Sequence, residues 1–126
     1  MKLENISIVL VGTTHPGNIG ATARAMHNMC FSRLVLVDPQ CPVGEIAYAR
    51  ASGAHAVLDG RRTCDDLQSA IADCHYVIAA SARRRSLNWP ELEPSRMAQT
   101  LLDLDQDRRA AIVLGREHSG LTNDEL

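Results

Sequence analysis

Short apolar runs alternate with amphipathic segments along this chain, and that alternation predicts an α/β fold. The first run, Ile6–Val11, is rich in β-branched residues and has the length of a buried strand. Comparable runs predict further strands over Leu34–Asp38, Tyr76–Ser81 and Ala110–Gly115. Because these runs are apolar throughout and helical segments separate them, we expect a parallel sheet flanked by helices that cover both of its faces.

The segments between the strands have the spacing of helices. In Asn18–Cys30 the apolar residues form one stripe, and a single arginine, Arg24, stands among small residues. The same reasoning predicts helices over Gly44–Ala54, Thr63–Cys74 and Glu93–Leu104. Gly53 is the expected end of the second helix, and Thr63 is the expected N-cap of the third. Ala56–Leu58 is at most a short strand.

Length and composition narrow the class of protein. A chain of 126 residues is expected to form one domain, and its 45% of hydrophobic residues suffices for a core. Aromatic residues make up only 3%, so that core is aliphatic. The formal net charge of −2 does not by itself indicate nucleic-acid binding. Any contact with RNA therefore needs a local basic patch.

The cysteines and the apolar runs point to a cytoplasmic protein. The four cysteines form no Cys-x-x-Cys pair, and no histidine pair has zinc-ligand spacing, so we predict no metal site. Buried thiols of this kind are ordinary in a reducing compartment. No signal peptide is visible, and no run approaches the roughly 20 apolar residues that span a bilayer. We therefore expect no membrane partner.

The last residues have the pattern of a helix start. Thr122 and Glu125 have the spacing of a capping box, and the sequence stops within that first turn. Because nucleation is the costly step of helix formation, a chain is not expected to end there. We therefore expect residues 1–126 to be the N-terminal part of a domain that continues past Leu126.

Three loops follow predicted strands and are the candidate binding segments. Ligands of open parallel sheets bind beyond the carboxyl ends of the strands. The loops there are Gly12–Gly20, Ala82–Pro90 and Gly115–Leu121.

Two familiar phosphate-binding motifs nearly fit the first loop. Gly12 and Gly17 have P-loop spacing, but Asn18 and Ile19 replace the lysine and the hydroxyl residue that the motif requires. A dinucleotide-binding turn needs an earlier glycine where His15 stands, and the loop is too long for that turn. A dinucleotide-binding domain remains a weaker alternative.

Together the three loops resemble a known family of enzymes. The motifs are Asn18-x-Gly20 with Arg24, Ser81-Ala82-Arg83-x-Arg85 with Trp89-Pro90, and Gly115-Arg116-Glu117 with Gly120-Leu121. In this order they resemble the SPOUT superfamily of RNA methyltransferases, in its TrmH-type 2′-O-ribose branch, and are most similar to the TrmJ-type tRNA methyltransferases. The resemblance implies an α/β knot fold whose C-terminal knot segment is absent from this sequence.

The resemblance also implies an activity. It is transfer of methyl from S-adenosylmethionine to a ribose 2′-hydroxyl of tRNA, at the pyrimidine of anticodon-loop position 32. A homodimer that shares the site between its protomers is implied as well. A non-catalytic RNA-binding module is the alternative of a different class.

Residue roles follow from the resemblance, and Arg24 is the implied catalytic residue. A solvated helix arginine is the ordinary alternative. Because a guanidinium stays protonated in proteins, we expect Arg24 to hold a phosphate or hydroxyl and to stabilise developing negative charge.

The remaining motif residues divide between cofactor and RNA. The implied cofactor-binding residues are Ala80, Ser81, Ala82, Gly115 and Glu117, and the implied RNA-binding residues are Asn18, Gly20, Arg83 and Arg85. Structural alternatives stay open for several of them: Asn18 as a helix cap, Gly20 in close packing, small residues against a helix, and Glu117 bonded within its loop.

Overall fold

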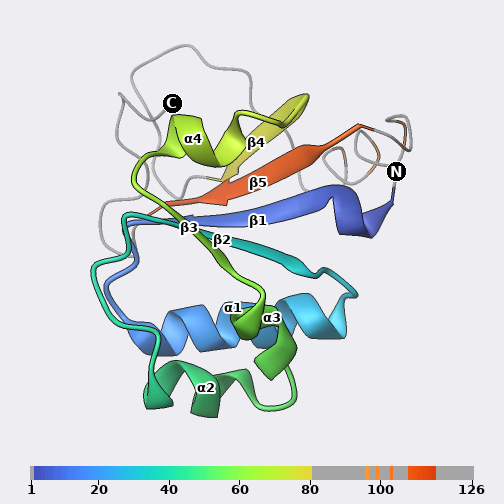
Figure 1. The fold of residues 1–126 in the computed structure, drawn as a ribbon. Helices are drawn as coiled ribbons and strands as arrows, with labels where there is room; N and C mark the ends of the chain where they lie inside the picture. The colour runs from blue at the N-terminus through green and yellow to red at the C-terminus, as the bar shows by residue number, and fades with distance from the viewer. Residues whose placement is uncertain (1, 81–95, 97–98, 100–102, 104–107, 116–126) are drawn as a thin grey trace.

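The protein is a five-stranded parallel sheet with helices on both faces, as the computed structural model of residues 2–80, 96, 99, 103 and 108–115 shows (Figure 1). The strand order is β3-β2-β1-β5-β4, and every pairing is parallel. The strands are β1 (Ile6–Val11), β2 (Arg33–Val37), β3 (Arg62–Cys64), β4 (Tyr76–Ala80) and β5 (Ala110–Leu114). The helices are the 3-10 turn η1 (Leu3–Asn5), α1 (Pro16–Asn28), α2 (Glu45–Ala51), α3 (His55–Asp59) and α4 (Leu67–Ile71). The predicted α/β class with a parallel sheet is confirmed.

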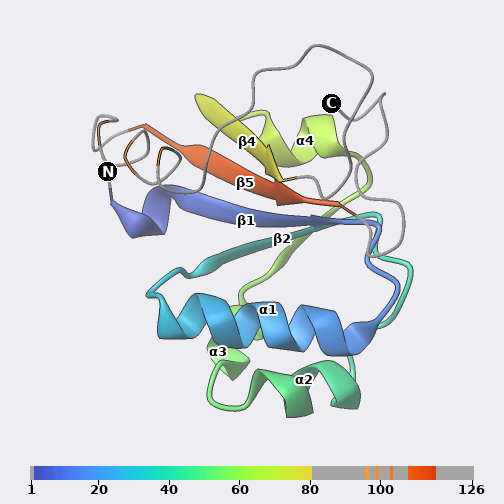
Figure 2. The same cartoon turned by 180° about the vertical axis from the view of Figure 1, so that it is seen from behind.

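The helices divide between the two faces of the sheet. α1, α2 and α3 lie on one face and α4 on the other (Figures 1 and 2). Each face has its own apolar cluster, one centred on Ile8, Leu10 and Ile19 and the other on Val9, Val11 and Val113. All six residues of β1 are buried because the strand lies in the middle of the sheet, between β2 and β5.

Two predictions between β2 and α4 were wrong. Ala56–Leu58 belongs to helix α3, whose Val57 and Leu58 are buried on the α1 side of the sheet. The third strand is instead Arg62–Cys64, which contains the residue predicted as an N-cap, Thr63. The N-cap of α4 is Asp66, whose side chain accepts a hydrogen bond of 2.7 Å from the Ser69 N–H. A polar three-residue edge strand carries no hydrophobic signal, and a short apolar run does not distinguish strand from helix.

The strand predicted over Tyr76–Ser81 is less buried than its sequence indicates. β4 lies at the edge of the sheet and pairs with β5 alone, and Val77 on it is 40% exposed. The predicted helix over Glu93–Leu104 lies mostly outside the described residues. Within it Arg96, Gln99 and Asp103 are helical, and the Gln99 Nε2 donates to the Asp103 Oδ1 at 3.0 Å.

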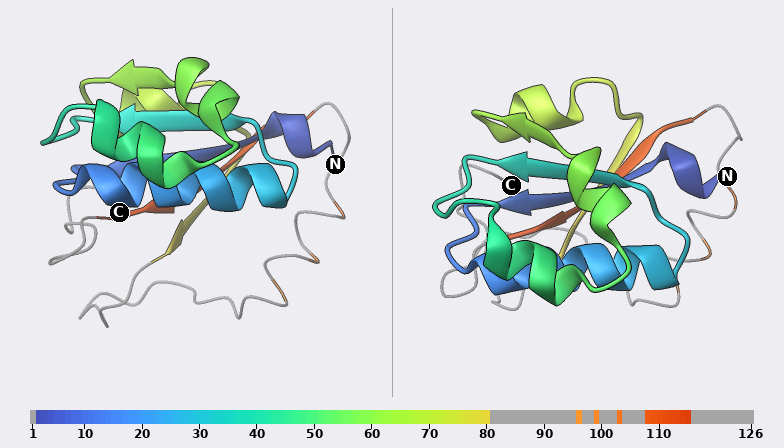
Figure 3. Two further views of the ribbon diagram at one scale, coloured as in Figure 1. Left: turned by 90° about the horizontal axis from the view of Figure 1, so that it is seen from below. Right: turned by 60° about the horizontal axis from the view of Figure 1, so that its bottom comes forward.

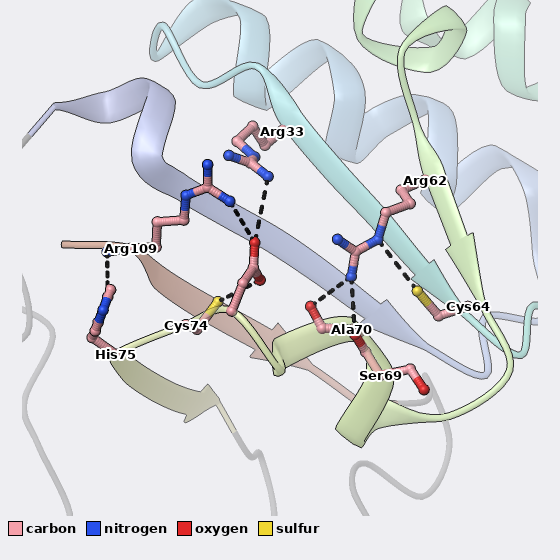
Figure 4. Close-up of polar contacts among 9 residues, drawn as sticks. Arg33, Arg62, Cys64, Ser69, Ala70, Cys74, His75 and Arg109 are labelled. Carbon is pink, nitrogen blue, oxygen red and sulfur yellow. Dashed lines mark hydrogen bonds and ion pairs between the residues drawn. The ribbon is translucent and has the colours of Figure 1, made fainter. Parts of the chain in front are cut away.

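A polar cluster lies at the edge of the sheet where the strands begin (Figure 4). The Asp73 carboxylate accepts a 2.5 Å hydrogen bond from the Arg109 Nη1, and the Arg33 Nη2 lies 4.0 Å away. The Arg109 N–H donates to the His75 Nδ1 at 3.1 Å, and the His75 N–H donates to the Arg109 carbonyl at 2.7 Å. Because Arg33 begins β2 while Arg109 and His75 precede β5 and β4, the cluster joins the starts of three strands.

Candidate functional site

The carboxyl ends of β1, β5 and β4 lie side by side at one edge of the sheet. Leu10 of β1 and Ala80 of β4 are both paired with Leu114 of β5. The strands all point toward this edge, which is at the left in Figure 1. The chain forms β2 and β3 on one side of β1 before crossing to β4 and β5, so the order reverses between β1 and β5. Ligands of open α/β sheets bind outside such a reversal.

The loop after β1 is held in place by the loop after β2. Gly12 has a φ of 64°, a conformation that favours glycine, and its N–H donates to the Val37 carbonyl at 2.8 Å. The Thr13 carbonyl accepts from the Gln40 N–H at 2.9 Å, and Thr13 is buried. These bonds place the start of α1 at the carboxyl edge of the sheet.

Two of the five predicted cofactor-binding residues are described. Ala80 ends β4 and is exposed, and Gly115 directly follows β5 and is half-buried. The pairing of Ala80 with Leu114 puts these two small residues on neighbouring strands at the same edge. The other three, Ser81, Ala82 and Glu117, lie outside the described residues. So do the predicted RNA-binding residues Arg83 and Arg85.

The helix that carries the first motif begins earlier than predicted. Its N-cap is His15 and its first residue is Pro16, a favoured residue at that position. Asn18 is therefore an exposed residue inside the first turn, and its interpretation as the helix cap is wrong. The Asn18 carbonyl accepts a hydrogen bond of 2.8 Å from the Thr22 Oγ1.

Gly20 is a packing residue between two helices. It is buried, and a Cβ there would overlap the Ala47 carbonyl oxygen and lie 2.8 Å from the Arg50 Cβ. Figure 3 shows α2 alongside α1, which is the contact that Gly20 permits. Close packing, one of the two interpretations of Gly20, is thus what the structure shows, and a contact with RNA stays a prediction.

Arg24 lies on the exposed side of α1 in a shallow groove of about 360 Å³. The groove is lined by Ala21, Arg24, Ala25, Asn28 and Arg50. It includes neither Ala80 nor Gly115, so within the described part of the chain Arg24 and the strand ends are separate parts of the candidate site.

Arg50, from the last turn of α2, is the second charged residue of the groove, and the sequence analysis did not single it out. A methyl group built on Gly17 would lie 3.8 Å from its Cγ and Cζ, so the Arg50 side chain lies over the first turn of α1. Within the described residues, neither the Arg24 nor the Arg50 side chain makes a hydrogen bond or an ion pair. The one signal in the sequence that could have indicated Arg50 is that it is the single basic residue of a helix rich in alanine.

The described residues offer neither a metal site nor a membrane-spanning helix. They contain no group of three or more histidine, cysteine, aspartate or glutamate side chains that could hold a metal ion. None of the helices among them has the length and apolar character needed to cross a membrane.

Comparison with known proteins gives matches along almost the whole chain. The model of the SpoU rRNA Methylase family matches residues 5–126. The "tRNA (cytidine/uridine/adenosine-2'-O-)-methyltransferase TrmJ" of Pseudomonas aeruginosa (strain UCBPP-PA14) is 51% identical over 126 residues, which cover 98% of this chain and 49% of that protein. The chain thus spans about half the length of the curated relatives it matches.

Solved structures agree with this match. "A probable methylase family protein from Haemophilus influenzae Rd KW20" is 44% identical, with a TM-score of 0.91, over 98% of this chain and 52% of that one. TrmJ from Z. mobilis ZM4 is 36% identical, with a TM-score of 0.86, over 94% of this chain and 53% of that one.

Proposed function

Because this chain belongs to the SpoU rRNA methylase family, we propose that the protein of which it is part methylates a ribose 2′-hydroxyl of tRNA with S-adenosylmethionine as donor. The observation that carries the proposal is the meeting of β1, β5 and β4 at one edge of the sheet, where each is followed by one of the three motif segments. The name of the relative from Pseudomonas aeruginosa, a tRNA 2′-O-methyltransferase, supports the substrate and the reaction.

The strand ends fit the cofactor. Ala80 and Gly115 present no side chain beyond Cβ at neighbouring strand ends, so a flat adenine ring can approach the backbone N–H and carbonyl groups there. We assign Ala80 and Gly115 to this pocket, with Ser81, Ala82 and Glu117 completing it. When bound, S-adenosylmethionine supplies an activated methyl group on a sulfonium.

The work left to the protein is positioning and charge stabilisation. A ribose hydroxyl is a weak nucleophile, so it must be oriented toward the methyl group and must lose its proton. Arg24 cannot serve as a base while its guanidinium is charged. We assign it the roles of holding the substrate and stabilising the negative charge that develops on the 2′-oxygen.

A shared site in a homodimer accounts for the separation of the two parts. The groove that holds Arg24 does not reach Ala80 or Gly115 of the same chain. In the proposed homodimer, Arg24 of one protomer faces the strand ends of the other. We place this enzyme in the cytoplasm, where tRNA is found.

The target nucleotide is the most specific part of the proposal. We propose the pyrimidine at position 32 of the anticodon loop. The name of the relative from Pseudomonas aeruginosa includes adenosine beside cytidine and uridine. The base should therefore be tested at that position by substituting each of the three nucleosides in the tRNA.

The deciding experiment is methyl transfer by the full-length protein. Labelled S-adenosylmethionine is incubated with bulk tRNA, and the modified nucleoside is then mapped. Label at a 2′-O-ribose of the anticodon loop is the expected result. Binding of tRNA without transfer would indicate a non-catalytic RNA-binding module. Calorimetric binding of NADH but not of S-adenosylhomocysteine would indicate a dinucleotide-binding domain instead.

A further inference from the structure

The position of Arg50 depends on two glycines of α1. Its Cβ would lie 2.8 Å from a methyl group on Gly20, and its Cγ, Nε and Cζ would lie 3.8–3.9 Å from one on Gly17. The long side chain is therefore laid across α1 where that helix has no side chains of its own. The location of Arg50 on the surface follows from helix packing, because the α1–α2 contact determines the position of its Cα.

The groove combines two cations and has no anion of its own. Arg24 and Arg50 both line it, and the other lining residues are two alanines and an asparagine. Within the described part of the chain, no carboxylate pairs with either guanidinium. Like charges that share a groove repel each other unless an anion lies between them. A groove of this size is within the range of small-molecule sites, roughly 300–1,000 Å³.

We propose that Arg50 binds a backbone phosphate of the tRNA strand whose nucleotide Arg24 contacts. The inference rests on the proposed function, and it adds a positioning residue that the motifs do not contain. A guanidinium is suited to this task because its planar fork of donors matches two phosphate oxygens at once. Phosphate contacts determine the register of a nucleic acid without reading its sequence, so Arg50 positions the strand and leaves base choice to other groups.

Arg50→Gln in the full-length protein tests the proposal. The variant removes the charge, and Arg50→Lys keeps the charge without the fork. Arg108→Gln is the matched control, because Arg108 is also exposed but lies outside the groove, two residues before β5 begins. Circular dichroism and a thermal melt establish whether each variant is folded. If Arg50→Gln does not fold, Arg50→Lys is used to test the proposal.

The readouts separate positioning from chemistry. For Arg50→Gln we expect the slope of log Kd for tRNA against log salt to fall by about 0.7–0.9, the loss of one phosphate contact. We expect KM for tRNA to rise on the order of 10-fold, with kcat and cofactor affinity retained. Arg50→Lys should keep most of the salt slope and lose part of the affinity. Arg108→Gln should match the wild type in each measurement.

The outcomes distinguish this inference from the proposed function. An active wild type whose Arg50→Gln variant keeps both the salt slope and KM would overturn the inference alone. A change in sedimentation with an unchanged salt slope would mean that Arg50 contacts the partner protomer and not tRNA, which also overturns the inference. A wild type that transfers no methyl, but whose tRNA binding weakens in Arg50→Gln, would reject the enzymatic proposal and support the phosphate contact.

Discussion

The backbone of Gly20 in α1 lies against the carbonyl of Ala47 in α2, with no room between them for even a methyl group. This contact brings the two helices together on one face of the sheet. It also positions Arg50 beside the groove that contains Arg24. A glycine of the first motif thus shapes the candidate site through packing.

Gly20→Ala should destabilise the protein. Alanine is the better helix former by about 1 kcal/mol, but overpacking of a tight contact costs about 1–3 kcal/mol. We therefore expect a net loss in the free energy of unfolding, measured by urea denaturation. The control is Gly17→Ala in the same helix, where the added methyl meets only ordinary contacts of 3.8 Å. Equal stabilities for the two variants would contradict the packing role.

Asp73 should contribute a pH-dependent part of the stability. The hydrogen bond from the Arg109 guanidinium holds the pKa of the Asp73 carboxyl below its ordinary value, although partial burial opposes this. A lowered folded-state pKa stabilises the fold above the unfolded pKa of about 3.9, and this stabilisation disappears as the pH falls through the folded pKa.

The pH dependence of Asp73→Asn checks that sign. The variant should be less stable than the wild type at pH 7, and the difference should shrink below about pH 4. Because the two side chains are 40% and 44% exposed, we expect a loss under about 1 kcal/mol. Asp65→Asn is the control, since within the described residues Asp65 makes no hydrogen bond or ion pair. A loss of unfolding free energy in Asp73→Asn that does not vary with pH would contradict the ion pair.

Arg62 should stabilise the last turn of α4. Its Nη2 donates to the carbonyls of Ser69 and Ala70 at 3.2 and 2.9 Å (Figure 4). A cation at a helix C-terminus is also favourable to the helix dipole. Arg62→Gln should lower the free energy of unfolding by about 1 kcal/mol in a denaturant titration. Arg62→Lys should lose less, because it keeps the charge, and equal losses would indicate that the dipole has no part.

Arg24→Ala in the full-length protein should remove nearly all turnover in the proposed methyl transfer. Loss of a group that stabilises developing negative charge costs about 10²–10³ in kcat. S-adenosylmethionine affinity by calorimetry should be retained, because the Arg24 groove does not include Ala80 or Gly115. Arg24→Lys keeps the charge without the planar fork and should be intermediate. Near-normal turnover of Arg24→Ala would refute the role.

The basic segment after β4 should contribute to the salt dependence of tRNA binding. Removal of Arg83 or Arg85 should each reduce the slope of log Kd against log salt by about 0.7–0.9. Arg84→Gln is the matched control, because Arg84 stands outside the motif and should matter less. A slope that is unchanged in Arg83→Gln and Arg85→Gln would count against direct phosphate contact.

Local pattern predicted most elements of the fold and missed two short ones, α3 and β3. β1, β2 and β5 are recognisable because strands near the centre of a parallel sheet are apolar throughout, and α1 because its buried residues recur with helical spacing. Such signals are weak in α3, with five residues, and in the polar edge strand β3. At the edge, β4 has the same apolar sequence without the same burial.

By itself the sequence determined which segments are candidates for the site: the three loops, their small residues and Arg24. The tertiary structure decided which of them meet, because strand order and helix packing depend on contacts between residues far apart in the chain. Insertion of β5 between β1 and β4 put Ala80 and Gly115 at one edge. The Gly20 contact put Arg50 into the groove of Arg24, a neighbour that no spacing along the chain could indicate.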